Sequence, residues 1–457
     1  MAVSPPPLAP ALPARRAWAL ADVLGWRSRA LVTALLLLLA AALVWNVLQF
    51  PWRKGYDASA VAHYAEALGQ HHRLPTRAET DVWHNPPLYF ALAGALYRAG
   101  ELTGLGDPGI PVQLFSAACV LGIVLLCGLI ARELVPDWRL AGVAAALAAV
   151  ATPVLVRSAV LFHPEPLAAL LTTAGLYVAV GSLARGRLGL RSGAAAGLLL
   201  GLANLTRTWA LAALAAALAG ALVAVAASRS RSSVRFAAGL AGVSLLLLAP
   251  WLAVKAERYG SPFAYSQPNP EQWRRSGRPA SFWLATDLGA VFHSPYQPWY
   301  RNHLLPTVYS DWVGDYWRAY AVPSRLHDEP DRLPARWGDP LVRQSWAGLV
   351  PLALTLVGAA GLALRAVRRR DLALATLLLS AATLLAMYAA FLARYPKQDG
   401  DNIKALYLLD LAPVAALAAA WGFRLSWGGS ALRRAAVALA AAATLVVSAS
   451  FLVLPPA

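Results

Sequence analysis

The segment YDASAVAHYAEALGQHHRLPTRAETDVWHNPPLYF (residues 56–90) is a polar stretch that lies between two apolar parts of the chain. Its second residue, Asp57, stands just beyond the end of the first long apolar run. Its last residues, HNPPLYF (84–90), lead through two prolines into the next apolar segment. A membrane protein has few structural reasons to place this much polar chemistry between two apolar segments. We therefore interpret this segment as one wall of an active site on the non-cytoplasmic face.

The composition around this segment is that of a helical membrane protein. Hydrophobic residues make up 58% of the 457 residues, and charged residues only 14%. Apolar runs of roughly 17–22 residues recur along the chain, which is the length that crosses ~30 Å of hydrocarbon. Backbone polar groups find no water inside a bilayer, so these runs must be helical. The sequence predicts an all-α polytopic membrane protein, a bundle of about 11–12 transmembrane helices with external juxtamembrane helices.

The net charge of +17 does not indicate a nucleic-acid partner. The arginines form short clusters between apolar runs, for example at 185–191 and 229–235, as the positive-inside rule predicts for cytoplasmic loops. Residues 1–28 are predicted to be a disordered cytoplasmic N-terminus, and residues 29–457 the transmembrane domain. The Ala-, Leu- and Arg-rich composition favours a bacterial plasma membrane, with the active site facing outside. Lysine occurs only at positions 54, 255, 397 and 404, so a lysine outside the cytoplasmic clusters is a candidate functional residue.

Two external regions interrupt the apolar runs, a first loop at 51–86 and a large loop at 255–345. Within the first loop, residues 57–69 have the apolar spacing of an amphipathic helix that lies on the bilayer surface. Counting membrane crossings back from the cytoplasmic arginine clusters leaves residues 86–103 with no crossing to make, so this segment does not fit as a full span. Either this segment is a re-entrant or surface helix, or a neighbouring segment does not cross.

Residues 193–227 form an apolar stretch that is too long for one simple span and is interrupted at Arg207. It fits two short helices with a polar turn between them. Gly193, Gly197 and Gly201 repeat every four residues, which permits close contact with another helix.

Several short motifs follow one another in a characteristic order. Asp57 comes after the first apolar run, and a Leu-Pro step at 74–75 comes before the Pro-Pro step. The further motifs are HNPPLY (84–89), GLANLTR (201–207), PW (250–251), RYGSPF (258–263) and KALYLLDLAP (404–413). This order resembles the GT-C glycosyltransferases, above all the branch of dolichyl-phosphate-mannose protein mannosyltransferases and aminoarabinose transferases. The resemblance covers about residues 50–415.

The resemblance implies an enzyme that transfers a sugar from a polyprenyl-phosphate donor to an acceptor outside the cytoplasm. The acceptor can be a glycan, a lipid or a protein. The isoprenoid tail of the donor would lie among helices and membrane lipids, with its phosphate and sugar at the interface. One departure concerns the acids: the family has a second acid after the first span, whereas Ala58 follows Asp57 here.

Two acids are candidates for catalysis. Asp57 is the candidate general base, because a carboxylate against an apolar wall has a raised pKa that suits proton abstraction. Its alternative role is the N-cap of the helix at 57–69. Glu165 is the second candidate, and its alternative role is that of an interface residue at a helix start rich in proline. No cofactor is required by this scheme, although the two carboxylates together can hold a divalent cation.

Further side chains are candidates for substrate binding. His84 precedes the Pro-Pro step, where the family has lysine or histidine, and as a cation it would contact the donor phosphate or orient Asp57. Arg207 and Lys404 suit phosphate binding, and snorkelling to the interface is the alternative for both. The full predicted set is His63, His84, Tyr89, Arg207, Arg394, Lys404 and Tyr407.

Other functions remain open at this point. A polytopic transporter or flippase for a lipid or solute would also suit Arg207 at membrane depth and the broken segment around it. Against a transporter, the sequence contains no repeated halves, and its acids gather in external loops. A non-catalytic membrane scaffold is a third alternative. The aromatic patch YSDWVGDYW (309–317) in the large loop is a candidate wall for the acceptor.

Overall fold

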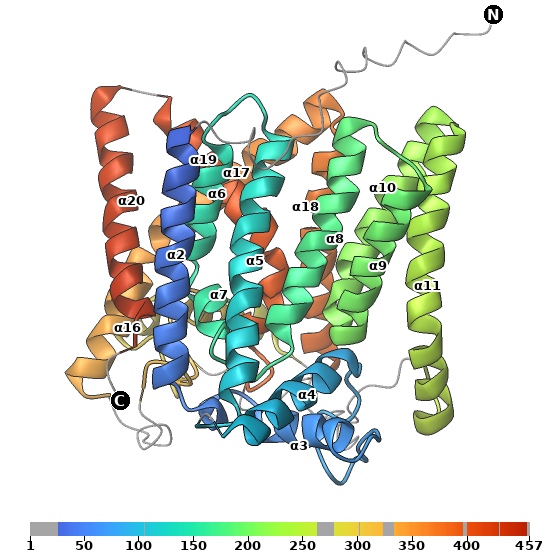
Figure 1. Cartoon of the computed structure of the whole chain (residues 1–457). Helices are drawn as coiled ribbons and strands as arrows, with labels where there is room; N and C mark the ends of the chain where they lie inside the picture. The colour runs from blue at the N-terminus through green and yellow to red at the C-terminus, as the bar shows by residue number, and fades with distance from the viewer. Residues whose placement is uncertain are drawn as a thin grey trace, which may run out of the picture.

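The described part of the chain is entirely helical wherever it is regular. The computed structural model describes residues 26–104, 106–262, 278–300, 302–322, 333–395, 400–428 and 430–454. Every regular element in these ranges is a helix, which confirms the predicted fold class. Figure 1 shows the long helices side by side in one bundle, with shorter helices gathered at one end. Residues 1–25, most of the predicted N-terminal segment, lie outside the described ranges.

Nine helical segments in the described ranges are long and apolar enough to cross a membrane. They are α2 (Trp26–Gln49), α5 (Ile110–Leu134), α8 (Glu165–Arg185), η2 (Thr208–Ala210) with α10 (Leu211–Ser228), α11 (Arg231–Tyr259), α16 (Ala335–Ala347) with α17 (Leu349–Arg369), α18 (Leu372–Arg394), η4 (Ala405–Leu411) with α19 (Ala412–Trp427), and α20 (Ala431–Leu452). The apolar window of α19 is 72% buried and that of α20 only 11%, so α19 is central and α20 peripheral. The protein is a multi-pass membrane protein.

Two shorter apolar helices complete the bundle. α6 (Ala141–Val150) packs on α5 and α19, and α9 (Leu190–Thr206) packs on α8 and α11. The apolar run at 140–156 is not one long helix, because Pro153 cannot donate a helical hydrogen bond and begins the separate α7 (Pro153–Ser158). The sequence predicts about 11–12 spans, whereas nine helical segments in the described ranges are long and apolar enough to cross a membrane, with α6 and α9 as shorter helices beside them.

The first loop, which the sequence predicts to be external, lies across one end of the bundle (Figure 1). It contains η1 (Trp52–Lys54) and α3 (Ala58–Gly69), the predicted amphipathic helix, which packs on α4 (Leu88–Thr103) (Figure 1). Within the described ranges α4 is not among the helices that are long and apolar enough to cross a membrane, which agrees with the prediction that 86–103 is a re-entrant or surface helix and not a full span. The contact between α3 and α4 requires glycine at position 94, because an added Cβ there would lie only 2.3 Å from the carbonyl oxygen of Ala65.

In its described residues the large loop, which the sequence also predicts to be external, supplies further short helices. They are α13 (Ala280–Leu284), α14 (Leu288–His293) and α15 (Leu304–Val313). α15 packs against both α7 and η4, so the loop folds back onto the bundle beside the start of α19.

Glycines let α9 and α11 approach each other at backbone distance, as the four-residue repeat predicts. A Cβ on Gly193 would lie 2.1 Å from the carbonyl oxygen of Phe236, and one on Gly197 would lie 2.5 Å from that of Leu240. The obstructing atoms belong to the backbone, so they cannot rotate away as a side chain would. This packing fixes the helix whose end carries Arg207.

We predict that Gly193→Ala destabilises the protein by about 1–3 kcal/mol, because the added methyl group overpacks this contact. Gly242→Ala is the matched control on α11, since a Cβ there would meet nothing within 4 Å. Thermal unfolding of the detergent-purified protein, followed by tryptophan fluorescence, measures both. Equal melting temperatures for the two variants would show that the close approach is not required.

Candidate active site

Asp57 occupies the first turn of the external loop, directly before α3. Its φ of 49° lies in the left-handed region, which aspartate tolerates better than most residues. It holds the N-cap position, but its side chain makes no capping hydrogen bond. The carboxylate is 41% exposed. The Asp57 side chain therefore does not cap α3, which was its alternative role.

Lys404 is the cation that faces Asp57 across the site. It is only 3% exposed, and its Nζ lies 3.4 Å from Asp57 Oδ2 and 3.3 Å from Asp401 Oδ1. Burial lowers the pKa of the Lys404 amine. The negative charges of the two aspartates and the nearby Tyr407 together raise it by more, so the pKa lies above its usual value. The amine therefore stays protonated, and a buried positive charge borders the exposed carboxylate.

Glu165 and Arg207 form a second, deeper cluster. Glu165 begins α8 and is 3% exposed; its two carboxylate oxygens contact Arg207 Nη2 and His163 Nδ1. Arg207 has extended backbone (φ −151°, ψ 137°) where α9 ends, as the polar interruption predicts. Its Nη1 donates a 2.7 Å hydrogen bond to Asn85 Oδ1, in the first external loop. The cluster thus ties two helix ends to that loop.

Two tyrosines lie beside this cluster. The guanidinium of Arg207 is 5.5 Å from the ring centroid of Tyr407, which stacks on Trp209. Tyr407 is also close to Lys404, so it connects the two groups of charges. Tyr89 is fully buried and lies near Glu165. The site thus brings together six of the residues that sequence reasoning selected for substrate binding or catalysis, namely Asp57, Tyr89, Glu165, Arg207, Lys404 and Tyr407.

His84 is held as a neutral imidazole, which corrects the expectation of a cation at this position. Burial lowers its pKa to about 3, and the positive charges of Arg207 and Lys255 act in the same direction. Lys255 is 6% exposed, and in the described ranges no hydrogen bond or ion pair joins it to another residue. Arg207 and Lys255 therefore place two positive charges around His84.

Part of the sequence and the fold as a whole are similar to those of known proteins. The sequence profile of the family described as dolichyl-phosphate-mannose-protein mannosyltransferase matches residues 84–253. The oligosaccharyltransferase of Archaeoglobus fulgidus superposes with a TM-score of 0.55 at 15% identity, over 94% of this chain and 57% of that chain. This chain has the GT-C fold.

Other comparisons place the GT-C chain among larger proteins. The Archaeoglobus fulgidus oligosaccharyltransferase AglB in complex with an inhibitory peptide and a dolichol-phosphate gives a TM-score of 0.54 at 16% identity, over 94% of this chain and 56% of that chain. This chain thus spans somewhat more than half the length of those oligosaccharyltransferases. ArnT from Cupriavidus metallidurans bound to undecaprenyl phosphate gives 0.40 at 17% identity, over 86% of this chain and 77% of that chain. No curated protein sequence matches the chain.

Only part of the site lies in the profile match. His84, Glu165 and Arg207 fall inside residues 84–253 of the GT-C chain, whereas Asp57 and Lys404 fall outside. The tertiary fold brings these outer two together, with Lys404 Nζ 3.4 Å from Asp57 Oδ2.

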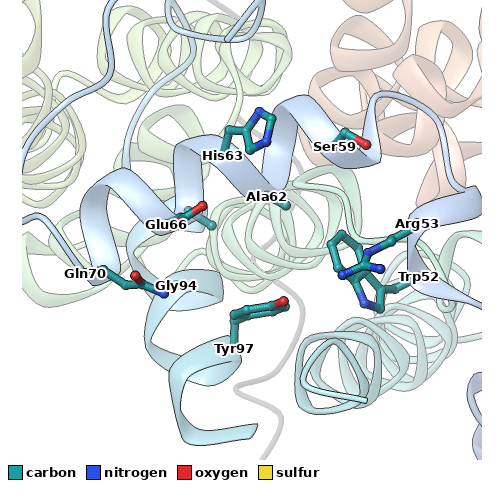
Figure 2. Close-up of a pocket in the computed structure, with 10 residues that line it drawn as sticks. Trp52, Arg53, Ser59, Ala62, His63, Glu66, Gln70, Gly94 and Tyr97 are labelled. Carbon is teal, nitrogen blue, oxygen red and sulfur yellow. The ribbon is translucent and has the colours of Figure 1, made fainter. Parts of the chain in front are cut away.

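Two predicted substrate-binding residues lie apart from both clusters. Arg394 is exposed at the last residue of α18. His63 is exposed on α3, where Figure 2 shows it with Glu66 and Tyr97 at a pocket of about 200 Å³. Asp57 does not line that pocket.

The two candidate acids of the GT-C chain do not share one cluster. Glu165 contacts Arg207 and His163, whereas Asp57 contacts Lys404. In the part of the chain that is described, no group of three or more His, Cys, Asp or Glu residues could hold a metal ion. We therefore derive no step through a divalent cation.

Sequence reasoning missed several members of the site. His163 adjoins Glu165 in the motif FHPEP, and Asp410 lies near both Glu165 and Arg207 from within KALYLLDLAP. Lys255 carried a signal, since lysine is rare in this chain, but nothing in the sequence indicated which residues it would face.

We predict that Glu165→Gln destabilises the protein by about 3–5 kcal/mol, because Arg207 keeps its buried charge and loses its anionic partner. The matched control is Glu79→Gln, which breaks an ion pair with Arg73 on the surface. There water screens the charges, so we expect little change. Denaturation of both purified variants measures the difference, and a similar small loss in both would contradict the assigned role of the buried pair.

We also predict a pH dependence that His84 causes. Its folded pKa, about 3, lies below the usual 6.5, so the unfolded chain binds the proton first as pH falls. The free energy of unfolding should then fall by up to about 1.4 kcal/mol per pH unit below pH ~6.5. His84→Asn removes this contribution, while His63→Asn, an exposed histidine, serves as the control. Melting curves between pH 4 and pH 8 test it, and parallel profiles for wild type and His84→Asn would contradict it.

Proposed function

We propose that the protein is a glycosyltransferase that moves a sugar from a polyprenyl-phosphate donor to an acceptor hydroxyl on the non-cytoplasmic side of the membrane. The observation that carries the proposal is the exposed carboxylate of Asp57, held 3.4 Å from the buried ammonium of Lys404 at the end of a GT-C bundle. A base and a cation side by side are what sugar transfer from a phosphate leaving group needs.

The proposed reaction is a single displacement. Asp57 takes the proton of the acceptor hydroxyl as that oxygen forms a bond to the anomeric carbon of the donor sugar. The bond between the anomeric carbon and the phosphate oxygen breaks, and its electron pair leaves with polyprenyl phosphate. Lys404 stabilises the negative charge that develops on the phosphate, since its amine stays protonated beside Asp57.

Two further cations, Arg207 and Lys255, are available to bind the donor phosphate. Arg207 is held by Glu165 and Asn85, which leaves its planar fork oriented beside Tyr407. Lys255 is a buried positive charge without a counter-charge in the described ranges, and a bound phosphate would supply one. His84, as a neutral imidazole, offers a hydrogen bond to the phosphate and adds no charge.

Glu165 is better suited to positioning than to proton abstraction. Its two oxygens face Arg207 and His163, and the residue is buried, so an acceptor hydroxyl would have to displace both partners. Asp57 is exposed and meets no such barrier. We therefore assign the base to Asp57 and the orientation of Arg207 to Glu165.

The comparisons support the class of donor. The oligosaccharyltransferase from Archaeoglobus fulgidus that shares the fold was solved with a dolichol-phosphate, a polyprenyl phosphate of the kind proposed here. We further propose a bacterial plasma membrane with the first external loop on the outer side, in line with the arginine clusters of the opposite loops.

We predict that the purified protein releases polyprenyl phosphate from at least one member of a panel of radiolabelled polyprenyl-phosphate sugars. Asp57→Asn should lower the rate by about 10²–10⁴-fold, the usual contribution of a general base. Glu79→Gln, which removes another exposed acid from the same loop, should leave the rate unchanged. Chromatography of the released lipid measures all three.

The other outcomes separate the alternatives. Equal release by wild type and Asp57→Asn would keep the enzyme and move the base to another acid. No release with any donor, from protein that melts cooperatively, would contradict the glycosyltransferase and favour a lipid or solute transporter.

A further inference from the structure

Asp311 is a fully buried carboxylate in α15 that touches the chain on both sides of the pair formed by Asp57 and Lys404. Its Oδ1 lies 3.4 Å from the hydroxyl of Tyr56, a long hydrogen bond from the residue before Asp57. Its Oδ2 accepts a 2.7 Å hydrogen bond from the backbone N–H of Ala405, the residue after Lys404. One carboxylate thus holds the neighbours of both members of the pair.

Arg157, in α7, fixes the orientation of this carboxylate. Its guanidinium is 2% exposed and contacts both Oδ1 and the backbone carbonyl of Asp311. The same guanidinium donates to the carbonyl oxygen of Gly314 at 2.7 Å and to Asp315 Oδ1 at 3.1 Å. A planar fork with this many acceptors leaves the Asp311 carboxylate little freedom to rotate.

Tyr56 transmits the position of Asp311 to the pair. Burial raises the pKa of Tyr56 well above its usual value, and the charge of Asp311 acts in the same direction, so the phenol stays protonated and donates. The ammonium of Lys404 lies 5.3 Å from the centroid of the Tyr56 ring. A movement of Tyr56 would therefore shift the support of Lys404 and the backbone of Asp57 together.

We propose that Asp311 is a positioning residue that sets the separation of the Asp57 carboxylate and the Lys404 ammonium by holding residues 56 and 405 on one carboxylate. The inference rests on the proposed function for its catalytic meaning, because the pair supplies the base and the leaving-group cation. Both acids of the aromatic patch at 309–317 are buried, so the prediction that this patch forms a wall for the acceptor concerns its aromatic side chains.

A variant of Asp315 serves as the control that separates positioning of the pair from general support of the fold. It is equally buried and shares Arg157 with Asp311. Its oxygens accept hydrogen bonds from the backbone N–H groups of Ala319, Tyr320 and Ala321, which belong to its own loop. Asp315→Asn therefore disturbs the same buried charge cluster without touching residue 56 or 405.

The test uses the four lysines of the chain, which make amine labelling easy to assign by mass spectrometry. In Asp311→Asn the side chain can no longer accept from both Tyr56 and Ala405, so Lys404 should acylate roughly two- to tenfold faster than in wild type. Lys255 reports general loosening and should not change. In Asp315→Asn, the labelling of Lys404 should stay near the wild-type rate.

Unchanged labelling of Lys404 in Asp311→Asn, or an equal rise in both variants, would overturn the inference. If Asp311→Asn also exposes Lys255 and so has lost its fold, Tyr56→Phe decides, because it removes only one hydroxyl. A rise at Lys404 alone in that variant supports positioning, and no rise overturns it.

Sugar transfer gives the second readout. Asp311→Asn should lower kcat by roughly 10–100-fold in the wild-type background, as small misplacements of catalytic groups do. It should lower kcat much less in a Lys404→Met background, because both changes act on one pair. Additive losses would overturn the inference. Wild-type protein that is inactive but shows the predicted labelling would refute the proposed function and leave the positioning role intact.

Discussion

The contact between the guanidinium of Arg207 and the carboxylate of Glu165 is the interaction on which this end of the bundle depends. A charge this deeply buried is costly unless a partner meets it with good geometry. Arg207 stands where α9 ends, Glu165 stands where α8 begins, and Asn85 reaches the same guanidinium from the external loop. Satisfying one arginine therefore fixes two helix ends and the loop that leads to α4.

Arg157 applies the same constraint on the other side of the site. It is almost fully buried, and its partners Asp311 and Asp315 come from the large external loop. That loop is thereby held against the start of η4, where Lys404 lies. The two buried arginines thus each hold one of the two loops in place, and the carboxylate of Asp57 remains exposed.

Much of the scaffold could be predicted from the sequence, because local patterns determine it. The repeat of Gly193 and Gly197 predicts a close helix contact, and the contact with Phe236 and Leu240 is of that kind. The charged interruption at Arg207 predicts a helix break, which is where α9 ends. Residues 57–69 predict a surface helix, which is α3. Each of these depends on residues within a few turns of one another.

The state of the site residues could not be predicted, because distant partners set it. His84 reads as a potential cation, yet burial beside Arg207 and Lys255 keeps it neutral. The patch at 309–317 is predicted as an aromatic wall for the acceptor, and nothing in the sequence indicated that its two acids pair with the buried Arg157. Glu165 reads as a second catalytic acid, yet its oxygens face His163 and Arg207.

By itself the sequence determined a multi-pass helical protein with one acid at the edge of its first external loop, since apolar run length and helical periodicity are local properties that a bilayer enforces. Only the tertiary structure decided that Asp57 meets Lys404, 347 positions later in the chain, and that Asp311 supports both. The physical reason is that a buried charge must be paired, and the fold alone determines which distant partner comes within reach.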